Sequence, residues 1–259
     1  HCDTIGEIYE NRLLGNNYKL KENNFHVDIN KLKKGNYLLQ NFAMFIDIKK
    51  HKKPYKTLQE MIAVYYEELE DNKDVIRPVY SYEDIYACEK ENKIAALLTI
   101  EDAGALEGSL MNLKTVYEQG VRLITLTWNH INEVGFPNFK IEADTYGDIK
   151  EKPNFKIPNT EFGLTDFGVE LIREMERLGI IVDVSHLSDA GFYDVLKYSK
   201  KPFVASHSNS RKITNVVRNL TDDMIRKLAD KGGLTGINFC SFQCMVMVVL
   251  QEIILMLMI

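Results

Sequence analysis

Five residues that can bind a metal ion stand at the ends of segments that the sequence predicts as β-strands: His1, Asp3, Glu101, His186 and His207. Glu101 follows LLTI, His186 follows IVDVS, and His207 follows FVAS. Imidazole nitrogens and carboxylate oxygens are suitable zinc ligands, and a bridging carboxylate can hold two ions about 3.5–4 Å apart. Taken alone, each His or Glu at a strand end is more often a hydrogen-bonded structural residue than a metal ligand. Their order along the chain, H-x-D, E, H, H, predicts a shared metal site.

The opening triplet His1-Cys2-Asp3 supplies two of these candidates. Side chains alternate along an extended chain, so we expect His1 and Asp3 on one face and Cys2 on the other. Three further histidines lie in loops or polar segments and are not expected to bind metal: His26, His51 and His130. Cys240 and Cys244 have no second cysteine pair nearby, which favours small buried side chains over a zinc site.

Apolar runs of strand length alternate with capped amphipathic segments from the middle of the sequence onward. The expected strands are 94–100, 121–127, 180–184, 203–206 and 234–239. The expected helices are 109–119, 165–178, 188–199 and 221–231. This alternation predicts βαβ units with a parallel sheet, and the fold that fits best is an α/β, (β/α)₈ TIM-type barrel. No eighth strand is found, and the first is expected to be cut short at His1.

Two segments do not follow this alternation. Residues 129–160 form a long polar stretch with Pro137, Pro153 and Pro158, for which a substrate-covering lid and an ordinary surface insertion both stay open. Residues 241–259 are atypically apolar, and the sequence favours a non-native end over a buried helix or a membrane-contacting tail. The expected domain is therefore residues 1–240, followed by this tail.

Composition excludes several classes of protein. The chain has 259 residues, of which 45% are hydrophobic and 27% charged, as in ordinary globular domains. The net charge is −5, from 32 Lys and Arg against 37 Asp and Glu, and no basic block is present, so nucleic-acid binding is not expected. No run is long enough to span a membrane. Four scattered cysteines and the lack of a visible signal peptide favour a cytoplasmic location.

Longer motifs resemble the membrane (renal) dipeptidase family, zinc peptidases of the amidohydrolase superfamily, and bacterial members in particular. The matching stretches run from residue 1 to about 240 and include LLTIEDAGALEGS, GLTDFGVELIREMERLGIIVDVSHLSD and FVASHSNSRKITNVVRNLTDDMI. The resemblance implies hydrolysis of dipeptides by a hydroxide that bridges two zinc ions per protomer. It leaves assembly as a homodimer open.

The resemblance also implies roles for single residues. His1 and Asp3 match the pair that binds one zinc ion. Glu101 matches the residue that bridges both ions. His186 and His207 match the pair that binds the second ion. Arg218 matches the arginine that receives the terminal carboxylate of the dipeptide, for which a guanidinium fork is well suited.

The sequence departs from the family pattern at two places. Trp128 stands where better-known members carry a substrate-contacting histidine, and His130, two residues later, is the candidate replacement. The family's G-[ST]-D-F-D-G segment, whose first Asp transfers a proton, has no counterpart after GGLTGINF.

Two alternative functions stay open from the sequence. One is another amidohydrolase-type metal-dependent hydrolase, although many of those carry H-x-H on the first strand and a lysine on the fourth. The other is a catalytically impaired fragment of a dipeptidase, which the lack of an eighth strand favours.

Overall fold

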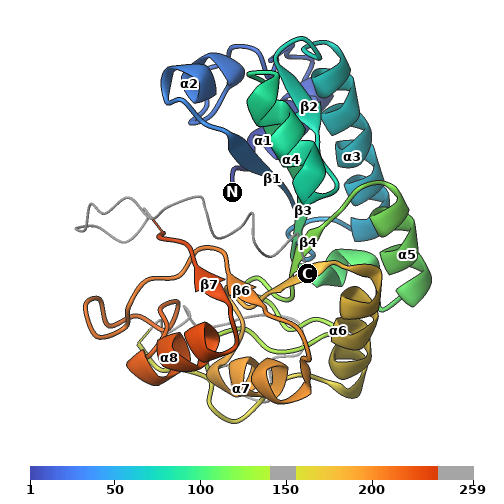
Figure 1. Cartoon of the computed structure of the whole chain (residues 1–259). Helices are drawn as coiled ribbons and strands as arrows, with labels where there is room; N and C mark the ends of the chain where they lie inside the picture. The colour runs from blue at the N-terminus through green and yellow to red at the C-terminus, as the bar shows by residue number, and fades with distance from the viewer. Residues whose placement is uncertain (141–155, 239–259) are drawn as a thin grey trace. The chain divides into compact units, whose positions relative to one another are not determined.

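The computed structural model describes residues 1–140 and 156–238, which fall into two compact units (Figure 1). The first unit runs from His1 to Ile124, and the second begins at Thr125. In both units strands alternate with helices along the chain.

The first unit contains α1 (Thr4–Leu13), α2 (Ile29–Lys34), β1 (Leu39–Phe45), α3 (Pro54–Glu70), β2 (Ile76–Pro78), α4 (Tyr82–Lys90), β3 (Ile94–Glu101), the short 3₁₀ helix η1 (Ala103–Leu106) and α5 (Leu110–Glu118). The strand β4 (Leu123–Thr125) leads into the second unit. β3 pairs in parallel with β1 on one side and β2 on the other. Phe45 is the register partner of Glu101, so β1 and β3 end at the same level and Glu101 stands at that edge.

The central strand of this unit is buried over its whole length, which explains its apolar sequence IAALLTIE. Tyr65 of α3 is fully buried, donates a hydrogen bond to the backbone oxygen of Ala96 at 3.0 Å, and packs against Phe42 with ring centroids 5.8 Å apart. The helix α3 is thereby fixed to both β1 and β3, and α4 also packs on β3 (Figure 1).

The second unit contains α6 (Asp166–Leu178), β5 (Ile181–Asp183), α7 (Asp189–Tyr198), β6 (Val204–Ala205), α8 (Asp222–Asp230) and β7 (Leu234–Thr235). β5 pairs in parallel with β6, and β6 with β7. The side chains of Thr165, Ser188 and Thr221 each accept a backbone N–H in the first turn of the helix that follows. These caps satisfy N–H groups that have no partner inside the helix.

Local signals placed the elements of the second half well. All four expected helices occur, with the expected caps, and Gly179 ends α6 in the left-handed region at φ 87°. The five expected strands occur: β3 extends one residue further than expected, to Glu101, and the other four are shorter. No element was predicted between residues 4 and 93, where α1, α2, β1, α3, β2 and α4 lie.

The long polar stretch of residues 129–160 is described at its two ends. An isolated antiparallel bridge from Phe139 to Pro158 joins the two ends to each other, and another from Pro137 to Leu187 joins the first end to the segment after β5. Residues 141–155, and with them the choice between lid and insertion, lie outside the described residues, as does the apolar tail from residue 241.

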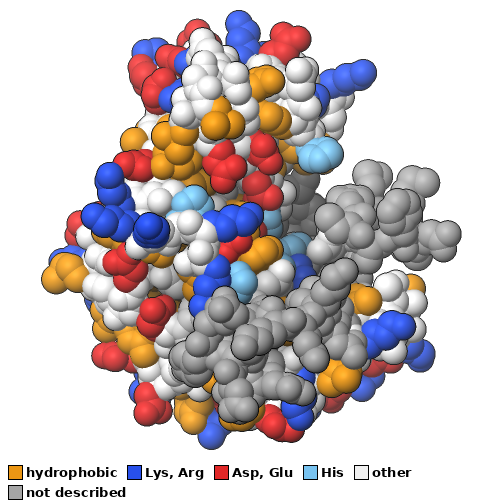
Figure 2. Space-filling model, turned by 180° about the vertical axis from the view of Figure 1, so that it is seen from behind, with side chains coloured by type: hydrophobic (Ala, Val, Ile, Leu, Met, Phe, Trp, Pro, Cys, Tyr) orange, Lys and Arg blue, Asp and Glu red, His pale blue; other side chains and the backbone are white. Residues whose placement is uncertain are grey.

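Charged side chains of both signs are interspersed over the face shown in Figure 2, without a large area of one sign. Among the helices of the described residues, none combines the length and the apolar character needed to cross a bilayer.

Candidate functional site

Glu101 is the last residue of β3 and is buried, with 4% of the residue exposed. The backbone oxygen of Glu101 accepts the N–H of Ile46, 3.3 Å away, so the strand end is held in place. The Nε2 atom of His1 lies 3.1 Å from Oε2 of Glu101 and 3.4 Å from Oδ1 of Asp3. The first unit therefore brings together one imidazole and two carboxylates, from three of the candidate residues.

The backbone of the opening triplet differs from the expected extended strand. Within the triplet only Cys2 bridges a strand: it pairs with Phe42 of β1 in parallel, and it is buried. Asp3 is instead the N-terminal cap of α1, with φ −101° and ψ 15°. The ligand atoms of His1 and Asp3 are brought together by this turn into α1 rather than by strand alternation.

His186 and His207 are brought together in the second unit from the loops that follow β5 and β6. Their Nε2 atoms face each other at 3.1 Å, within the roughly 4 Å that two nitrogens bound to one zinc ion can span. His186 adopts a left-handed backbone with φ 68°, which is costly for a non-glycine residue and is concentrated at functional sites in proteins.

The other nitrogen of each ring has its own partner. The Nδ1 atom of His186 lies 3.2 Å from Oδ1 of Asn129, and Nδ1 of His207 lies 2.7 Å from Oγ of Ser206. The single hydroxyl proton of Ser206 goes to Oδ2 of Asp183 at 2.5 Å, so the hydroxyl can only accept from His207. Both imidazoles are thus assigned the tautomer with the proton on Nδ1 and a lone pair on Nε2.

This arrangement fits a metal ion. Two lone pairs facing each other repel unless a cation or a proton lies between them. Two imidazole nitrogens bound tetrahedrally to one zinc ion at about 2.0–2.1 Å would be about 3.3 Å apart, close to the 3.1 Å between His186 and His207. Metal-binding histidines also usually donate their second N–H to a carbonyl or carboxylate system, as these two do.

Asp183 is fully buried at the end of β5 and forms hydrogen bonds with residues at the ends of the neighbouring strands. Its carboxylate accepts four hydrogen bonds, from the backbone N–H groups of Ser185 and Ser206 and from the hydroxyls of Thr125 and Ser206. Burial by itself would raise the pKa of Asp183, but the electrostatic attraction to the N–H side of His207 and the hydrogen bonds from Ser206 and Ser185 outweigh it, so the pKa lies below its ordinary value. Asp183 is therefore an ionised anchor.

Trp128 and His130 lie beside this histidine pair. The Trp128 ring packs edge-on against His130 with centroids 5.5 Å apart, and its centroid is 6.3 Å from that of His186. The indole thus lies near both the His186 ring and the ring of His130, the residue proposed to contact the substrate. Whether His130 contacts a substrate stays a prediction.

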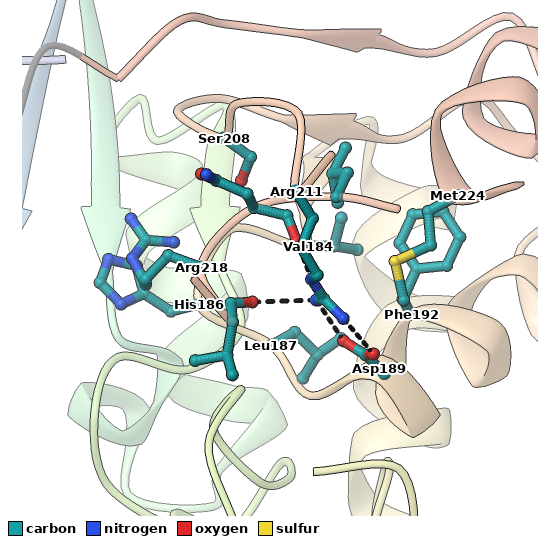
Figure 3. Close-up of a pocket in the computed structure, with 12 residues that line it drawn as sticks. Val184, His186, Leu187, Asp189, Phe192, Ser208, Arg211, Arg218 and Met224 are labelled. Atoms are coloured by element: carbon teal, nitrogen blue, oxygen red, sulfur yellow. Dashed lines mark hydrogen bonds and ion pairs between the residues drawn. The ribbon is translucent and has the colours of Figure 1, made fainter. Parts of the chain in front are cut away.

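Arg218 lies on the segment between β6 and α8 and is half-buried. One of its guanidinium nitrogens lies 3.5 Å from the backbone oxygen of His207. Arg218 and His186 line a common cavity, with Ser208, Arg211 and Asn219 (Figure 3). The cavity volume of about 10 Å³ has room for about one water molecule, so a dipeptide does not fit inside it.

Three residues around this site were missed in the sequence: Asn129, Ser206 and Arg211. Each acts through a hydrogen bond to another residue, and the helix and strand patterns of the sequence do not reveal which residue that is. The SHSNSR stretch contains two of them, and only the polar density of that stretch could have pointed to them.

The first unit also contains a cluster of three carboxylates that resembles a metal site in its residue types but is neutralised by basic side chains. Glu67, Glu68 and Asp71 lie close together, but Arg12 and Lys19 form ion pairs with them. The buried carboxylate of Glu68 also accepts the backbone N–H of Leu20 at 2.7 Å. This group ties the segment after α1 to α3.

Comparison with known sequences gives one family and several relatives. The family model described as membrane dipeptidase, peptidase family M19, matches residues 1–250. An uncharacterized protein of Klebsiella pneumoniae is 31% identical over 186 residues, which cover 72% of this chain and 64% of that protein. An uncharacterized dipeptidase of Schizosaccharomyces pombe is 35% identical over 155 residues, which cover 60% of this chain and 34% of that protein. The chain thus spans between about a third and two thirds of the length of these relatives.

Comparison with solved structures shows the fold. The metallopeptidase dipeptidase AC aligns with 92% of this chain over 70% of its own length, with a TM-score of 0.80 and 23% identity. A metallopeptidase of Rhodobacter sphaeroides, liganded with a phosphinate mimic of the dipeptide L-Ala-D-Ala, matches 92% of this chain and 72% of its own, with a TM-score of 0.79 and 22% identity. The fold is of the (β/α)₈-barrel type, as predicted, and the described residues contain seven of its strands.

Proposed function

Because the chain belongs to the membrane dipeptidase family, peptidase family M19, we propose that it is a zinc-dependent hydrolase that cleaves dipeptides. The observation that carries the proposal furthest is the pair His186 and His207, whose Nε2 atoms face each other at 3.1 Å. Their Nδ1 atoms are engaged by Asn129 and Ser206, which directs the lone pair of each Nε2 atom toward the other ring.

The residues that would hold two zinc ions are those of the sequence prediction: His1, Asp3, Glu101, His186 and His207. Zinc bound by them would lower the pKa of water and polarise the carbonyl group of a substrate. Asn129 and the Ser206–Asp183 pair keep the two imidazoles in the ligand tautomer. Glu101, which the resemblance makes the bridging ligand, is held at the edge of β3 by its backbone.

The proposed substrate class is a short peptide with a free carboxyl terminus. Arg218 supplies a guanidinium group beside His207, and a carboxylate accepts two parallel hydrogen bonds from such a fork. A relative from Rhodobacter sphaeroides is liganded with a mimic of L-Ala-D-Ala, which makes this dipeptide and L-Ala-L-Ala suitable first substrates.

Metal removal tests the proposed activity directly. The full chain is expected to hydrolyse a dipeptide, to lose that activity on dialysis against a chelator, and to regain it with zinc but not with magnesium, which prefers oxygen ligands. Released amino acids and zinc content are measured on the same samples. Turnover that persists in protein with less than a tenth of an equivalent of metal would contradict the proposal.

Arg218→Ala is expected to raise KM for dipeptides by about 10- to 150-fold, since a hydrogen bond to a charged group contributes about 1.5–3 kcal/mol. Dipeptide amides should show little further loss, because the carboxylate is already gone. The comparison of KM for the free and amidated substrate measures this. If the Ala variant distinguishes the two as well as the parent does, another residue binds the carboxylate.

A further inference from the structure

The segment between β6 and α8 is closed into a loop at its base. The backbone N–H of Arg211 donates to the oxygen of Leu220 at 2.8 Å, and the N–H of Leu220 donates to the oxygen of Asn209 at 2.9 Å. Arg218 lies two residues before Leu220, close to this base. Its position therefore depends on what holds the chain between residues 211 and 220.

Arg211 holds that chain on both sides of Arg218. Its Nε donates to the backbone oxygen of Asn219 at 2.9 Å, and one terminal nitrogen donates to the backbone oxygen of Val217 at 3.0 Å. These are the residues directly before and after Arg218, so both neighbouring carbonyl groups are fixed by one guanidinium group.

The guanidinium group is itself fixed to a helix. It forms a bidentate ion pair with Asp189, with both nitrogen–oxygen distances 2.7 Å. Asp189 is the first residue of α7, where the helix dipole favours a negative charge, and only 8% of it is exposed. In Figure 3 Arg211 points to Asp189, whereas Arg218 points to the side on which the His186 ring lies.

We infer that Arg211 is a positioning residue that sets Arg218 for recognition of the substrate carboxylate, an inference that rests on the proposed function. Four hydrogen bonds from one planar fork to a carboxylate and two carbonyl groups need the geometry of arginine. A lysine ammonium keeps the charge but is a compact group that cannot span these acceptors. Arg211 thereby connects α7 to the backbone around the substrate-binding side chain.

The variant Arg211→Lys tests this in two ways. The first is the dissociation constant of the phosphinate mimic of L-Ala-D-Ala and of its C-terminal amide, which requires no turnover. We expect the variant to bind the free carboxylate about 10- to 100-fold more weakly than the parent, because a displacement near 1 Å is enough for such losses, and to bind the amide equally well. Arg177→Lys is the matched control, since Arg177 also forms a fork with a carboxylate, Glu174, but on the exposed face of α6.

The second measurement is hydrogen exchange of the backbone N–H groups of Asn219 and Leu220 in the unliganded protein. We expect faster exchange in Arg211→Lys and no change in Arg177→Lys. Parent-like binding of the mimic by Arg211→Lys, or an equal loss for mimic and amide, would overturn the inference even if exchange is faster. If the parent protein binds neither the mimic nor its amide, the proposed function is refuted. In that case the positioning role is still tested by hydrogen exchange, and unchanged exchange in Arg211→Lys would refute it.

Discussion

Glu101→Gln should lower the turnover of dipeptides by at least about 100-fold while the fold is retained. Substitution of groups that merely support metal ligands costs about 10- to 100-fold, and the bridging ligand proposed here should cost more. Gln has nearly the same shape, and the strand end is fixed by the backbone contact from Ile46, so the change removes charge rather than structure. A neutral amide bridges two cations poorly. Steady-state kinetics and zinc content of the purified variant measure the effect.

Glu118→Gln is the matched control for this substitution. Glu118 lies at the end of α5, its side chain is 63% exposed, and its contact with Lys114 is an exposed ion pair of the helix surface. We expect it to keep parental activity and zinc content. A Glu101→Gln variant with two zinc ions and parental turnover would remove Glu101 from the metal site.

The elements near the site were predictable because their signals are local. A Thr or Ser that caps a helix bonds within three residues, and Gly179 is needed where the chain turns left-handed, so each signal is readable in a short window. The strands β5, β6 and β7 were found for a related reason, as short apolar runs between such helices.

The elements of residues 4–93 were not predicted because their signals depend on tertiary structure. The strand β1, with the sequence LQNFAMF, carries Gln40 and Asn41 within it, and the side chain of Gln40 is nevertheless buried and donates to the backbone oxygen of Asn41 at 2.7 Å. Polar residues of this kind interrupt the apolar run that a strand pattern requires. The helix α3 is amphipathic, but its buried face includes Thr57 and Glu68, which a pattern of apolar spacing does not count.

The residues of the candidate site also fall into a predictable and an unpredictable group. Histidine and glutamate at strand ends were predicted, because residue type and position in the sequence are sufficient to propose them. The residues that set their chemical state were not, since Asn129 reaches His186 across 57 positions and Ser206 reaches Asp183 across 23. Such contacts exist only once the strands are folded.

Asp183→Asn should weaken zinc binding about 10- to 100-fold, although residue 183 is not a proposed ligand. In the parent, Oδ1 of Asp183 accepts two backbone N–H groups, while Oδ2 accepts the hydroxyl protons of Thr125 and Ser206. The backbone donors cannot turn, so the oxygen of Asn would stay with them. Its NH₂ group would then face the two hydroxyls, which would have to accept.

The consequence falls on His207. The hydroxyl proton of Ser206, no longer held by a carboxylate, would turn to Nδ1 of His207, which lies 2.7 Å away. The ring proton of His207 would then reside on Nε2, the atom that faces His186, and a zinc ion would have to displace it. Nitrogen chemical shifts of the imidazole in the metal-free protein distinguish the two tautomers, and a competition titration with a zinc-binding dye gives the affinity.

Thr125→Val is the control that separates this effect from a general weakening of the Asp183 network. It removes the other hydroxyl donor to Oδ2 and leaves the bond between Ser206 and Asp183 in place. We expect Thr125→Val to lower stability by about 1–3 kcal/mol in urea unfolding, as for a lost hydrogen bond to a buried charged group, while the tautomer of His207 stays unchanged. An Asp183→Asn variant that keeps the proton on Nδ1 and binds zinc as the parent does would show that Ser206 does not transmit the charge of Asp183 to the histidine.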